Sequence, residues 1–367
     1  MLGKLNQLNS KKQGKVYIVL AVCLVSFFII GIVAAIGGNL WANKNRVNDK
    51  LVVVSPHPVS FMEPLINEFE IETGIQVEVK SCGTTEAIQM IEEDENVDLM
   101  WGGSVLTVGP YKDDFLPYRS TASDCIYTQF KDNSFNTNCF TDVPSVLMIN
   151  TDLIGDIKIT GYEDLLQPEL KGKIAFADPT KSSSSYEHLV NMLYAMGSDD
   201  SNGNVKSDTP SVDSEKGFEY VNALLEQLDG NLLDSSSDVY EGVANGKYVV
   251  GLTFEEAALT MLSAGKHVRI VYMKEGVVST PDGIYINKNT KRADEAKAFV
   301  DFMLSYDTQV YVAQYLGRRS VRTDVSNSSE VLAKAQINII QVDRSLVINS
   351  REKWLEEFSN IAEKRRD

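Results

Sequence analysis

Several features that mark enzymes and metal proteins are missing from this sequence of 367 residues. It has only four cysteines and three histidines, with no C-x-x-C motif and no Cys/His cluster, so no metal site is expected. The motifs G-x-S-x-G and H-E-x-x-H and the phosphate-binding P-loop are also absent. We therefore expect no cofactor and no enzymatic activity.

Basic residues are scarce as well. The chain has 35 Lys and Arg against 51 Asp and Glu, and its net charge is −16. Residues 1–50 hold seven of the basic residues and a single acid, Asp49, so the rest of the chain is strongly acidic. Such a surface repels nucleic acid and anionic lipid headgroups, which excludes nucleic acid as a partner. A pocket with local donors can still bind a small anion.

One long hydrophobic run is present near the start of the chain. Val16–Ile36 has 21 residues without charge and follows a lysine-rich segment. A helix of this length spans a hydrocarbon core of about 30 Å. We expect residues 1–50 to form a cytoplasmic tail, an uncleaved membrane anchor and a linker, with the remainder at the extracytoplasmic face. A cleaved signal, with a loose site at Leu40–Ala42, would make the protein secreted or periplasmic, and lipidation at Cys23 is a third possibility.

Two cysteines bracket a polar loop. Cys125 and Cys139 lie on either side of residues 126–138, which are rich in Asn, Asp, Ser and Thr. In an oxidising compartment a disulfide here would contribute about 3 kcal/mol by closing the loop. The sequence leaves this pairing open, and Cys82 has no evident partner.

From Leu51 onward, short apolar segments alternate with amphipathic ones. Predicted strands cover 51–54, 75–79, 98–101, 145–150, 173–177, 248–253 and 268–273. Predicted helices cover 86–92, 185–196, 214–228, 255–264, 293–304 and 346–363, with another from Phe61 to a stop at Gly74. This order predicts an α/β fold with a parallel sheet, and 317 residues suffice for two domains.

Ligands of open α/β sheets bind at the carboxyl ends of the strands. The turns at those ends are rich in hydroxyl groups or glycine. They are residues 55–58, 81–85, 101–104, 178–185, 235–237 and 253–256.

Several segments, taken in order, carry a resemblance. They are Leu51–Pro58, Thr73-Gly-Ile-Gln-Val77, Cys82-Gly-Thr-Thr85, Val97-Asp-Leu-Met-Trp-Gly-Gly103, Leu165-Leu-Gln-Pro-Glu-Leu-Lys-Gly172, Ala177-Asp-Pro-Thr-Lys-Ser-Ser-Ser184, 296–305 and Gly317-Arg-Arg-Ser-Val-Arg322. Over roughly residues 51–325 the chain resembles the extracellular solute-binding proteins of the ferric-iron and hexose-phosphate type, which serve ABC importers.

The resemblance implies a two-lobed clamshell of the type II periplasmic-binding-protein fold with the ligand between the lobes. Lobe 1 would comprise 51–145 and 276–325, lobe 2 would comprise 146–275, and 326–367 would form a C-terminal helical segment. The chain would cross between the lobes near residues 140–150 and 275.

Iron-binding members of this family hold ferric ion through adjacent tyrosines on a turn after a strand. The matching turn here is Thr253-Phe-Glu-Glu256, and no Tyr-Tyr pair occurs anywhere in the sequence. Ferric iron is therefore the alternative ligand, and a polar organic anion, with hexose phosphate favoured, is the main expectation.

Hydroxyl-rich helix starts are the first candidate anion sites. Ser182, Ser183 and Ser184 precede one predicted helix, and Thr84 and Thr85 precede another. Free backbone N–H groups and the helix dipole favour an anion at such places. Ordinary N-capping is the alternative interpretation of both.

The resemblance implies that two further turns face the cleft. One carries Glu255, whose carboxylate can accept hydrogen bonds from sugar hydroxyls, and the other carries Ser235 and Ser236. The alternative is that Glu255 only begins a helix, where acidic residues are favourable.

Near the first strand, Ser55 and His57 lie in a turn restricted by flanking prolines, and His57 can donate to a phosphate or hydroxyl, or serve only the turn. Trp101, before Gly103, can stack on a sugar or be buried. The expected ligand-binding residues are Ser55, His57, Thr84, Thr85, Trp101, Gly103, Ser182, Ser183, Ser184, Ser235, Ser236 and Glu255.

Other residues are expected to be structural. His188 is expected at the surface, and the tyrosines at 306, 311 and 315, which have helical spacing, are expected to pack. Arg318, Arg319 and Arg322 are expected to pair with acids, and one of them can reach the cleft mouth.

The sequence thus predicts a binding protein, monomeric in solution, that closes its lobes around a phosphorylated or anionic sugar. It would pass the ligand to an ABC permease or present it to a sensor histidine kinase in the membrane. The expected anchor favours sensing, because a tethered receptor beside its kinase has no need to diffuse. The alternative is a ferric-iron receptor of an ABC importer.

Overall fold

A computed structural model describes residues 50–132, 134, 136–197, 212–327 and 331–365. The apolar run Val16–Ile36, in which the anchor is expected, lies outside these residues. Within the described ranges, no helix combines the length and the apolar character needed to cross a bilayer.

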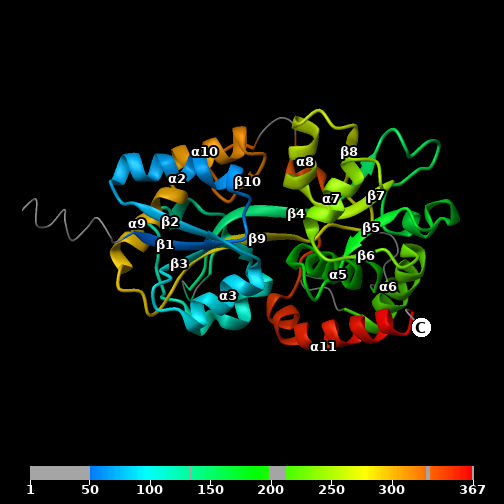
Figure 1. Cartoon of the computed structure of the whole chain (residues 1–367), viewed down its shortest axis with the longest axis horizontal. Helices are drawn as coiled ribbons and strands as arrows, with labels where there is room; N and C mark the ends of the chain where they lie inside the picture. Colours follow the sequence, from blue (N-terminus) through cyan, green and yellow to red (C-terminus); the bar gives the residue numbers. More distant parts are fainter. Residues whose placement is uncertain (1–49, 133, 135, 198–211, 328–330, 366–367) are drawn as a thin grey trace, which may run out of the picture. The chain divides into compact units, whose positions relative to one another are not determined.

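Residues 51–367 fold around one mixed sheet that is shared by two lobes (Figure 1). Along the sheet the strand order is β2-β1-β3-β9-β4-β7-β5-β6, and β8 and β10 also pair with β4. The strands are β1 Leu51–Ser55, β2 Val77–Ser81, β3 Leu99–Ser104, β4 Asn138–Asn150, β5 Ile174–Ala177, β6 Leu232–Leu233, β7 Val250–Phe254, β8 Val268–Val271, β9 Ser279–Ile286 and β10 Arg319–Ser320.

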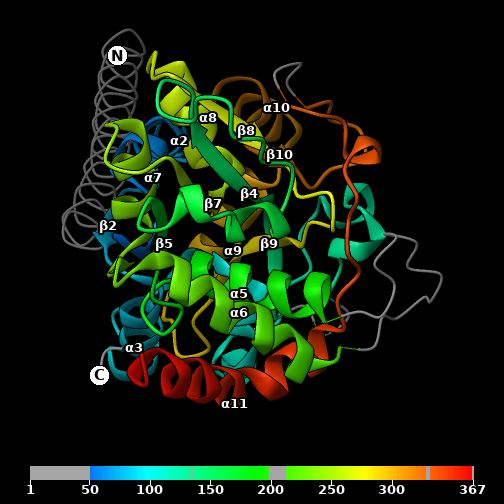
Figure 2. The ribbon, with the colours of Figure 1, turned by 90° about the vertical axis from the view of Figure 1, so that its right-hand side faces the viewer.

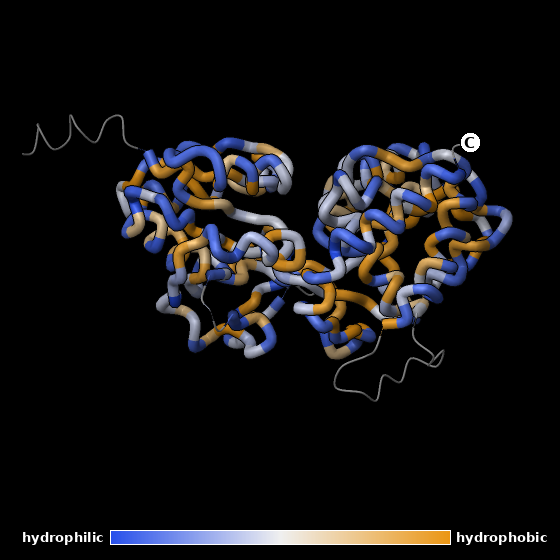
Figure 3. Tube along the Cα trace, turned by 90° about the horizontal axis from the view of Figure 1, so that it is seen from below, coloured by the Kyte–Doolittle hydropathy of each residue, from blue (hydrophilic) through white to orange (hydrophobic). Residues whose placement is uncertain are grey.

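The α-helices cover both faces of this sheet. They are α2 Val59–Thr73, α3 Thr84–Glu93, α4 Val105–Val108, α5 Ser183–Met196, α6 Ser214–Leu228, α7 Ser236–Ala244, α8 Glu255–Ser263, α9 Ala293–Met303, α10 Tyr306–Tyr315 and α11 Arg344–Glu363. Lobe 1 holds β1–β3 and β10 with α2, α3, α4, α9 and α10. Lobe 2 holds β5–β8 with α5–α8. Hydrophobic segments recur through both lobes (Figure 3).

An aromatic cluster forms the core of lobe 1. Trp101, Phe69, Phe140 and Phe299 are fully buried. Phe69 meets Phe299 edge to face with ring centroids 5.1 Å apart, and Trp101 meets Phe140 at 5.5 Å. Each such pair contributes about 1 kcal/mol beyond the burial of its apolar area. This cluster fixes the ends of β1 and β3, from which the first cleft residues follow.

In lobe 2, α5 and α6 pack closely against each other and against the sheet. At Gly217 on α6, a Cβ atom would lie 2.8 Å from the Cα of Leu193 on α5, so only glycine allows this approach. The close contact leaves the first turn of α5 directed toward the other lobe.

Two strands, β4 and β9, connect the lobes. β4 pairs with β9 and β10 up to Pro144 and with β7 and β8 from Ser145 onward. The sheet is therefore mixed, because β9 and β4 run antiparallel to their neighbours while β1–β3 and β5–β7 pair in parallel. β9 contains Pro281 and Gly283, and a register shift between β4 and β9 accommodates them.

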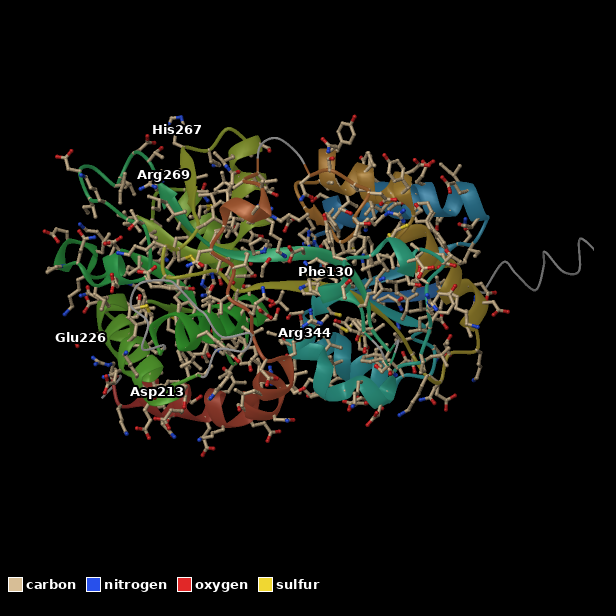
Figure 4. The ribbon with its side chains drawn as sticks, turned by 180° about the vertical axis from the view of Figure 1, so that it is seen from behind. Phe130, Asp213, Glu226, His267, Arg269 and Arg344 are labelled. Atoms are coloured by element: carbon tan, nitrogen blue, oxygen red, sulfur yellow. The ribbon has the colours of Figure 1, made fainter. Side chains whose placement is uncertain are left out.

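The C-terminal helix α11 lies beside α6 on lobe 2 (Figures 1 and 2). Its residues Val347, Trp354 and Phe358 are buried in the core of that lobe. The first residue of the helix, Arg344, donates from its guanidinium to the carbonyl oxygen of Gln129 at 2.8 Å (Figure 4). The segment thus bridges lobe 2 and the loop that precedes β4.

Cys82, Cys125 and Cys139 are free thiols, so the disulfide that the sequence left open is not formed here. The pKa of the Cys139 thiol is raised to about 12 by burial.

The expectation that the tyrosines of α10 pack in the core is wrong. Tyr306, Tyr311 and Tyr315 are 51%, 38% and 75% exposed, and the last two contact each other.

Phe358→Ala tests how much the docking of α11 contributes to stability. The ring is 1% exposed and lies edge to face with Phe176. Its loss should lower the free energy of unfolding by about 3–5 kcal/mol in urea titration, because a cavity remains. The control on the same helix, Leu346→Ala, removes a side chain that is 39% exposed and should change stability by about 0.5 kcal/mol. Equal losses for the two variants would contradict a docked helix.

Candidate functional site

A cavity of about 280 Å³ lies between the two lobes. Its wall comes from lobe 1 through the turns after β1 and β3 and the start of α3. Lobe 2 contributes the starts of α5 and α7 and the end of β7, and the connecting strands β4 and β9 complete the wall.

Three helix N-termini reach this cavity, those of α3, α5 and α7. Ser182 caps α5 by accepting from the backbone N–H of Ser185, and Ser235 caps α7 by accepting from that of Asp238. Gly83 occupies the cap of α3 without a side chain, which leaves its first N–H groups uncovered by a side-chain cap. The remaining unpaired N–H groups and the three helix dipoles make this part of the cavity favourable for an anion.

A buried cluster of charged groups forms another part of the wall. The Arg318 guanidinium donates to Asp282 Oδ2 at 2.9 Å and to Glu256 Oε2 at 3.1 Å. His57 Nε2 lies 3.3 Å from Asp282 Oδ2. Burial and the nearby Arg318 charge lower the pKa of His57, so the imidazole is neutral at pH 7. Burial alone would raise the pKa of Asp282, but the hydrogen bond from His57 and the Arg318 charge outweigh it and lower this pKa.

Gly102 makes room for this cluster. Its φ is +106°, and a Cβ atom there would lie 2.7 Å from His57 Nε2. Only glycine adopts this conformation readily, so the course of β3 near its end and the position of the imidazole depend on it.

Eight of the twelve expected ligand-binding residues line the cavity: His57, Thr84, Gly103, Ser182, Ser183, Ser184, Ser235 and Ser236. They come from five separate segments of the chain, and the fold brings them together. Thr84 Oγ1 lies 3.4 Å from Ser183 Oγ, a contact that joins the two lobes directly.

The other four lie elsewhere. Ser55 is buried and donates to the carbonyl oxygen of Trp101 at 2.6 Å. Trp101 is fully buried in the aromatic core, and Thr85 is exposed and does not line the cavity. Burial of Trp101 is the alternative that the sequence interpretation had kept for this residue.

Glu255 faces away from the cavity and forms an ion pair with Arg319. The guanidinium donates to both carboxylate oxygens at 2.8 Å, and both side chains are 2% exposed. Tyr272 also donates to Glu255. A buried carboxylate requires such partners, and the pair ties α8 of lobe 2 to β10 of lobe 1.

The pairing expected of the three arginines is confirmed. Arg318 pairs with Glu256 and Asp282, Arg319 with Glu255, and Arg322 with Asp324. Arg318 is the one that lines the cavity.

Sequence reasoning missed three acidic residues of the cavity, Glu187, Asp234 and Asp282. Glu187 lies one helical turn after Ser183 on α5, and this spacing could have placed it on the same face. It accepts a hydrogen bond from the Ser104 hydroxyl of lobe 1. Burial raises the pKa of Glu187, although the Ser104 and Thr280 hydroxyls and the charge of Arg344 partly offset the effect. Asp282 lay in a segment for which no strand was predicted.

Within the described ranges, no group of three or more His, Cys, Asp or Glu side chains is arranged to hold a metal ion. The turn Thr253–Glu256, which the sequence resemblance matched to an iron-binding turn, contributes Phe254 to the cavity wall. The hydroxyls, helix N-termini and Arg318 that face the cavity suit an oxygen-rich anion better than a hard cation.

The expected surface position of His188 is wrong, because this residue is fully buried. Its Nε2 lies 2.6 Å from the carbonyl oxygen of Thr253 and must donate to it. Nδ1 therefore accepts from the Tyr162 hydroxyl, 2.8 Å away. Burial lowers the pKa of His188 to about 4. The histidine links α5 to the strand that ends at the cavity.

The buried neutral His188 predicts a pH dependence of stability. The folded pKa of about 4 lies below the ordinary value of 6.5, so the unfolded chain takes up a proton that the folded chain does not. The free energy of unfolding should therefore fall as the pH drops from 6.5 to 4. In urea titrations at pH values between 4 and 7, His188→Gln should flatten this slope relative to the parent. Identical slopes in His188→Gln and the parent would contradict a buried neutral imidazole.

The ion pair between Glu255 and Arg319 predicts strong coupling. Glu255→Gln or Arg319→Met should each lower the free energy of unfolding by about 3–5 kcal/mol, because each leaves a buried partner unpaired. The double variant should lose clearly less than the sum, as measured in a urea double-mutant cycle. Additive losses would show that the two side chains do not depend on each other.

The chain is similar in sequence to curated periplasmic binding proteins. The curated spermidine/putrescine-binding periplasmic protein of Salmonella typhimurium is 25% identical to the chain over 197 residues, which are 51% of this chain and 52% of that protein. The chain thus spans about half the length of the curated spermidine/putrescine-binding relatives that it matches.

Solved structures share the fold over more of the chain. A two-component system protein described as mediating signal transduction is 29% identical, with a TM-score of 0.69 over 84% of this chain and 99% of that one. The periplasmic binding protein AfuA from Actinobacillus pleuropneumoniae, with exogenous fructose-6-phosphate bound, is 21% identical, with a TM-score of 0.75 over 86% and 98%. Apo ferric ion-binding protein A from Pasteurella haemolytica is 18% identical, with a TM-score of 0.69 over 85% and 98%.

These similarities confirm the expected two-lobed periplasmic-binding-protein fold. The binding proteins among these relatives agree with the expectation that the chain is not an enzyme. A family model described as bacterial extracellular solute-binding protein matches residues 64–338, which include all the cavity-lining residues except Pro56, His57 and Pro58. The chain belongs to the bacterial extracellular solute-binding protein family.

Proposed function

We propose that this protein captures a small anionic ligand, with a sugar phosphate favoured, between its lobes at the extracytoplasmic face of the membrane. The observation that carries the proposal is the convergence of three helix N-termini, with their hydroxyl groups, on one cavity. Each N-terminus favours an anion, and hydroxyl donors add hydrogen bonds without adding charge.

The size and the composition of the cavity support a sugar phosphate over other anions. A volume of about 280 Å³ is near the lower end for small-molecule sites and fits one compact ligand. Beside the anion-binding helix starts, the wall carries Glu187, Asp282 and Arg318, which offer acceptors and donors for polar groups. A phosphorylated polyol has both an anionic group and hydroxyls. A polyamine, in contrast, would place positive charge against helix N-termini.

Contacts between the lobes support binding by closure. Thr84 meets Ser183, Ser104 donates to Glu187, and Arg318 pairs with Glu256, so both lobes contribute to the same wall. A ligand that contacts both lobes adds interactions only in the closed form and shifts the population toward it.

We further propose that the closed form is read by a sensor histidine kinase in the membrane. The 29% identical solved structure described as a two-component system protein supports this role, as does the anchor expected at Val16–Ile36. Delivery to an ABC permease is the alternative, and the periplasmic binding proteins among the relatives support it. A kinase and response-regulator gene beside this one would favour sensing, and a permease and ATPase gene would favour import.

Thermal shift and calorimetry on the purified extracytoplasmic part test the ligand. Fructose 6-phosphate at about 100 times its Kd should stabilise the fold by about 2.7 kcal/mol and raise the Tm. Ser183→Ala should weaken this binding by about threefold to tenfold, and the exposed control Ser263→Ala should not change it.

Inorganic phosphate, spermidine and ferric citrate are the competing probes. No response to any sugar phosphate, together with a visible charge-transfer band on adding ferric citrate, would replace the proposal with ferric-iron binding. A response to spermidine alone would replace it with polyamine binding.

A further inference from the structure

Glu187 carries a buried carboxylate oxygen that forms no hydrogen bond within the described part of the chain. Its Oε1 accepts from the Ser104 hydroxyl of lobe 1, whereas its Oε2 is buried and has no hydrogen-bond partner among the described residues. Within the same residues, no lysine, arginine or histidine forms an ion pair with this carboxylate. An unpaired buried carboxylate oxygen costs free energy, so a group that donates to it is strongly favoured.

The hydroxyl of Thr280, on β9, is a second buried polar group that faces this problem of an unmet hydrogen bond. Its Oγ1 is buried without a hydrogen-bond partner in the described part of the chain. Thr280 and Glu187 line the same cavity, and the Thr280 hydroxyl lies close enough to influence the pKa of Glu187. A single hydroxyl group can satisfy both, because it donates to a carboxylate oxygen and accepts from the threonine.

The other two cavity carboxylates, Asp234 and Asp282, do not compete for this role. Asp234 is exposed and pairs with Lys181. Asp282 Oδ1 accepts from the backbone N–H and the hydroxyl of Thr141, at 2.8 and 2.7 Å. Its Oδ2 accepts from Arg318. Asp282 is therefore committed to the protein, and Glu187 Oε2 remains as the acceptor for a ligand.

The position of Glu187 on α5 sets what the ligand must look like. It follows Ser183, at the anion-binding start of the same helix, by about one turn, and one turn rises about 5.4 Å. An anion held at the helix start therefore needs a hydroxyl about that far from its charged group to reach Glu187. Inorganic phosphate is too small to occupy both places.

We propose that Glu187, assisted by Thr280, is the specificity-determining residue of this cavity and selects anions that carry a hydroxyl group, namely polyol or sugar phosphates, over inorganic phosphate. The inference rests on the proposed function, since it assumes that the anion binds at the helix starts. The inference adds to that function the carboxylate of Glu187, which distinguishes a hydroxyl-bearing anion from inorganic phosphate.

Calorimetry with fructose 6-phosphate and inorganic phosphate, at one pH and salt concentration, tests the inference. Glu187→Gln keeps an oxygen for Ser104 and places an amide N–H₂ donor where the acceptor was. We expect it to weaken fructose 6-phosphate binding by about tenfold to a hundredfold, the effect of a hydrogen bond to a charged group. Its affinity for inorganic phosphate should stay within about twofold of the parent. Glu92→Gln, at an exposed position on α3, is the matched control and should change neither.

The outcomes distinguish a role of Glu187 in ligand specificity from a purely structural role. Equal weakening of both anions by Glu187→Gln, or no weakening of either, would overturn the role of Glu187 while leaving the proposed function in place. Failure of the parent protein to bind either anion would overturn the proposed function as well.

If Glu187→Gln does not fold, as judged by its melting transition, Thr280→Val decides the question. This variant keeps the shape of the side chain and removes the hydroxyl. It should weaken fructose 6-phosphate selectively, by about threefold to tenfold. Unchanged fructose 6-phosphate affinity in Thr280→Val would then overturn the proposal.

Discussion

Paired burial of charge at the junction of the lobes is the constraint on which the rest of this structure depends. Arg318 and Arg319, next to each other in lobe 1, meet Glu256 and Glu255, next to each other at the start of α8 in lobe 2. A buried charge without its partner is costly, so each pair is favourable only when the partners from both lobes are in place. Arg318 also lines the cavity. The ion pairs between the lobes and the cavity wall therefore share a side chain.

The same pairing explains how a chain with a net charge of −16 can offer an anion site. Several carboxylates in or beside the cavity are engaged, since Glu255 and Glu256 bind arginines and Asp282 binds Arg318. Glu187 keeps one unpaired oxygen, and the starts of α3, α5 and α7 bring their backbone N–H groups and hydroxyls to the cavity. Local dipoles decide the sign of the potential over a few ångströms, whereas the net charge governs approach from a distance, where salt screens it.

Features fixed by local sequence could be predicted, and features fixed by distant partners could not. The helix α6 occupies the predicted residues, 214–228, because its apolar spacing and Asp213 cap are local signals. The serine and threonine residues at helix starts reach the cavity for the same reason. The strand β9 was not predicted, because Pro281 and Gly283 argue against a central strand, and only a register shift against β4 accommodates them. His188 is buried because Tyr162 and Thr253 satisfy its ring nitrogens, and neither partner is near it in sequence.

Glu255 illustrates which part of the candidate site could not be predicted from the sequence. The family resemblance pointed to the turn 253–256, of which Phe254 lines the cavity, yet the Glu255 side chain pairs with Arg319, which is 64 residues away. The residue with a free acceptor is instead Glu187, on a helix whose first turn had already been selected for its serines. Donors of the site were predictable because helix starts supply them whatever the surrounding fold. The acceptors of the site could not be predicted. A buried carboxylate is available to a ligand only if no cationic side chain of the protein pairs with it, and that pairing depends on the whole tertiary structure.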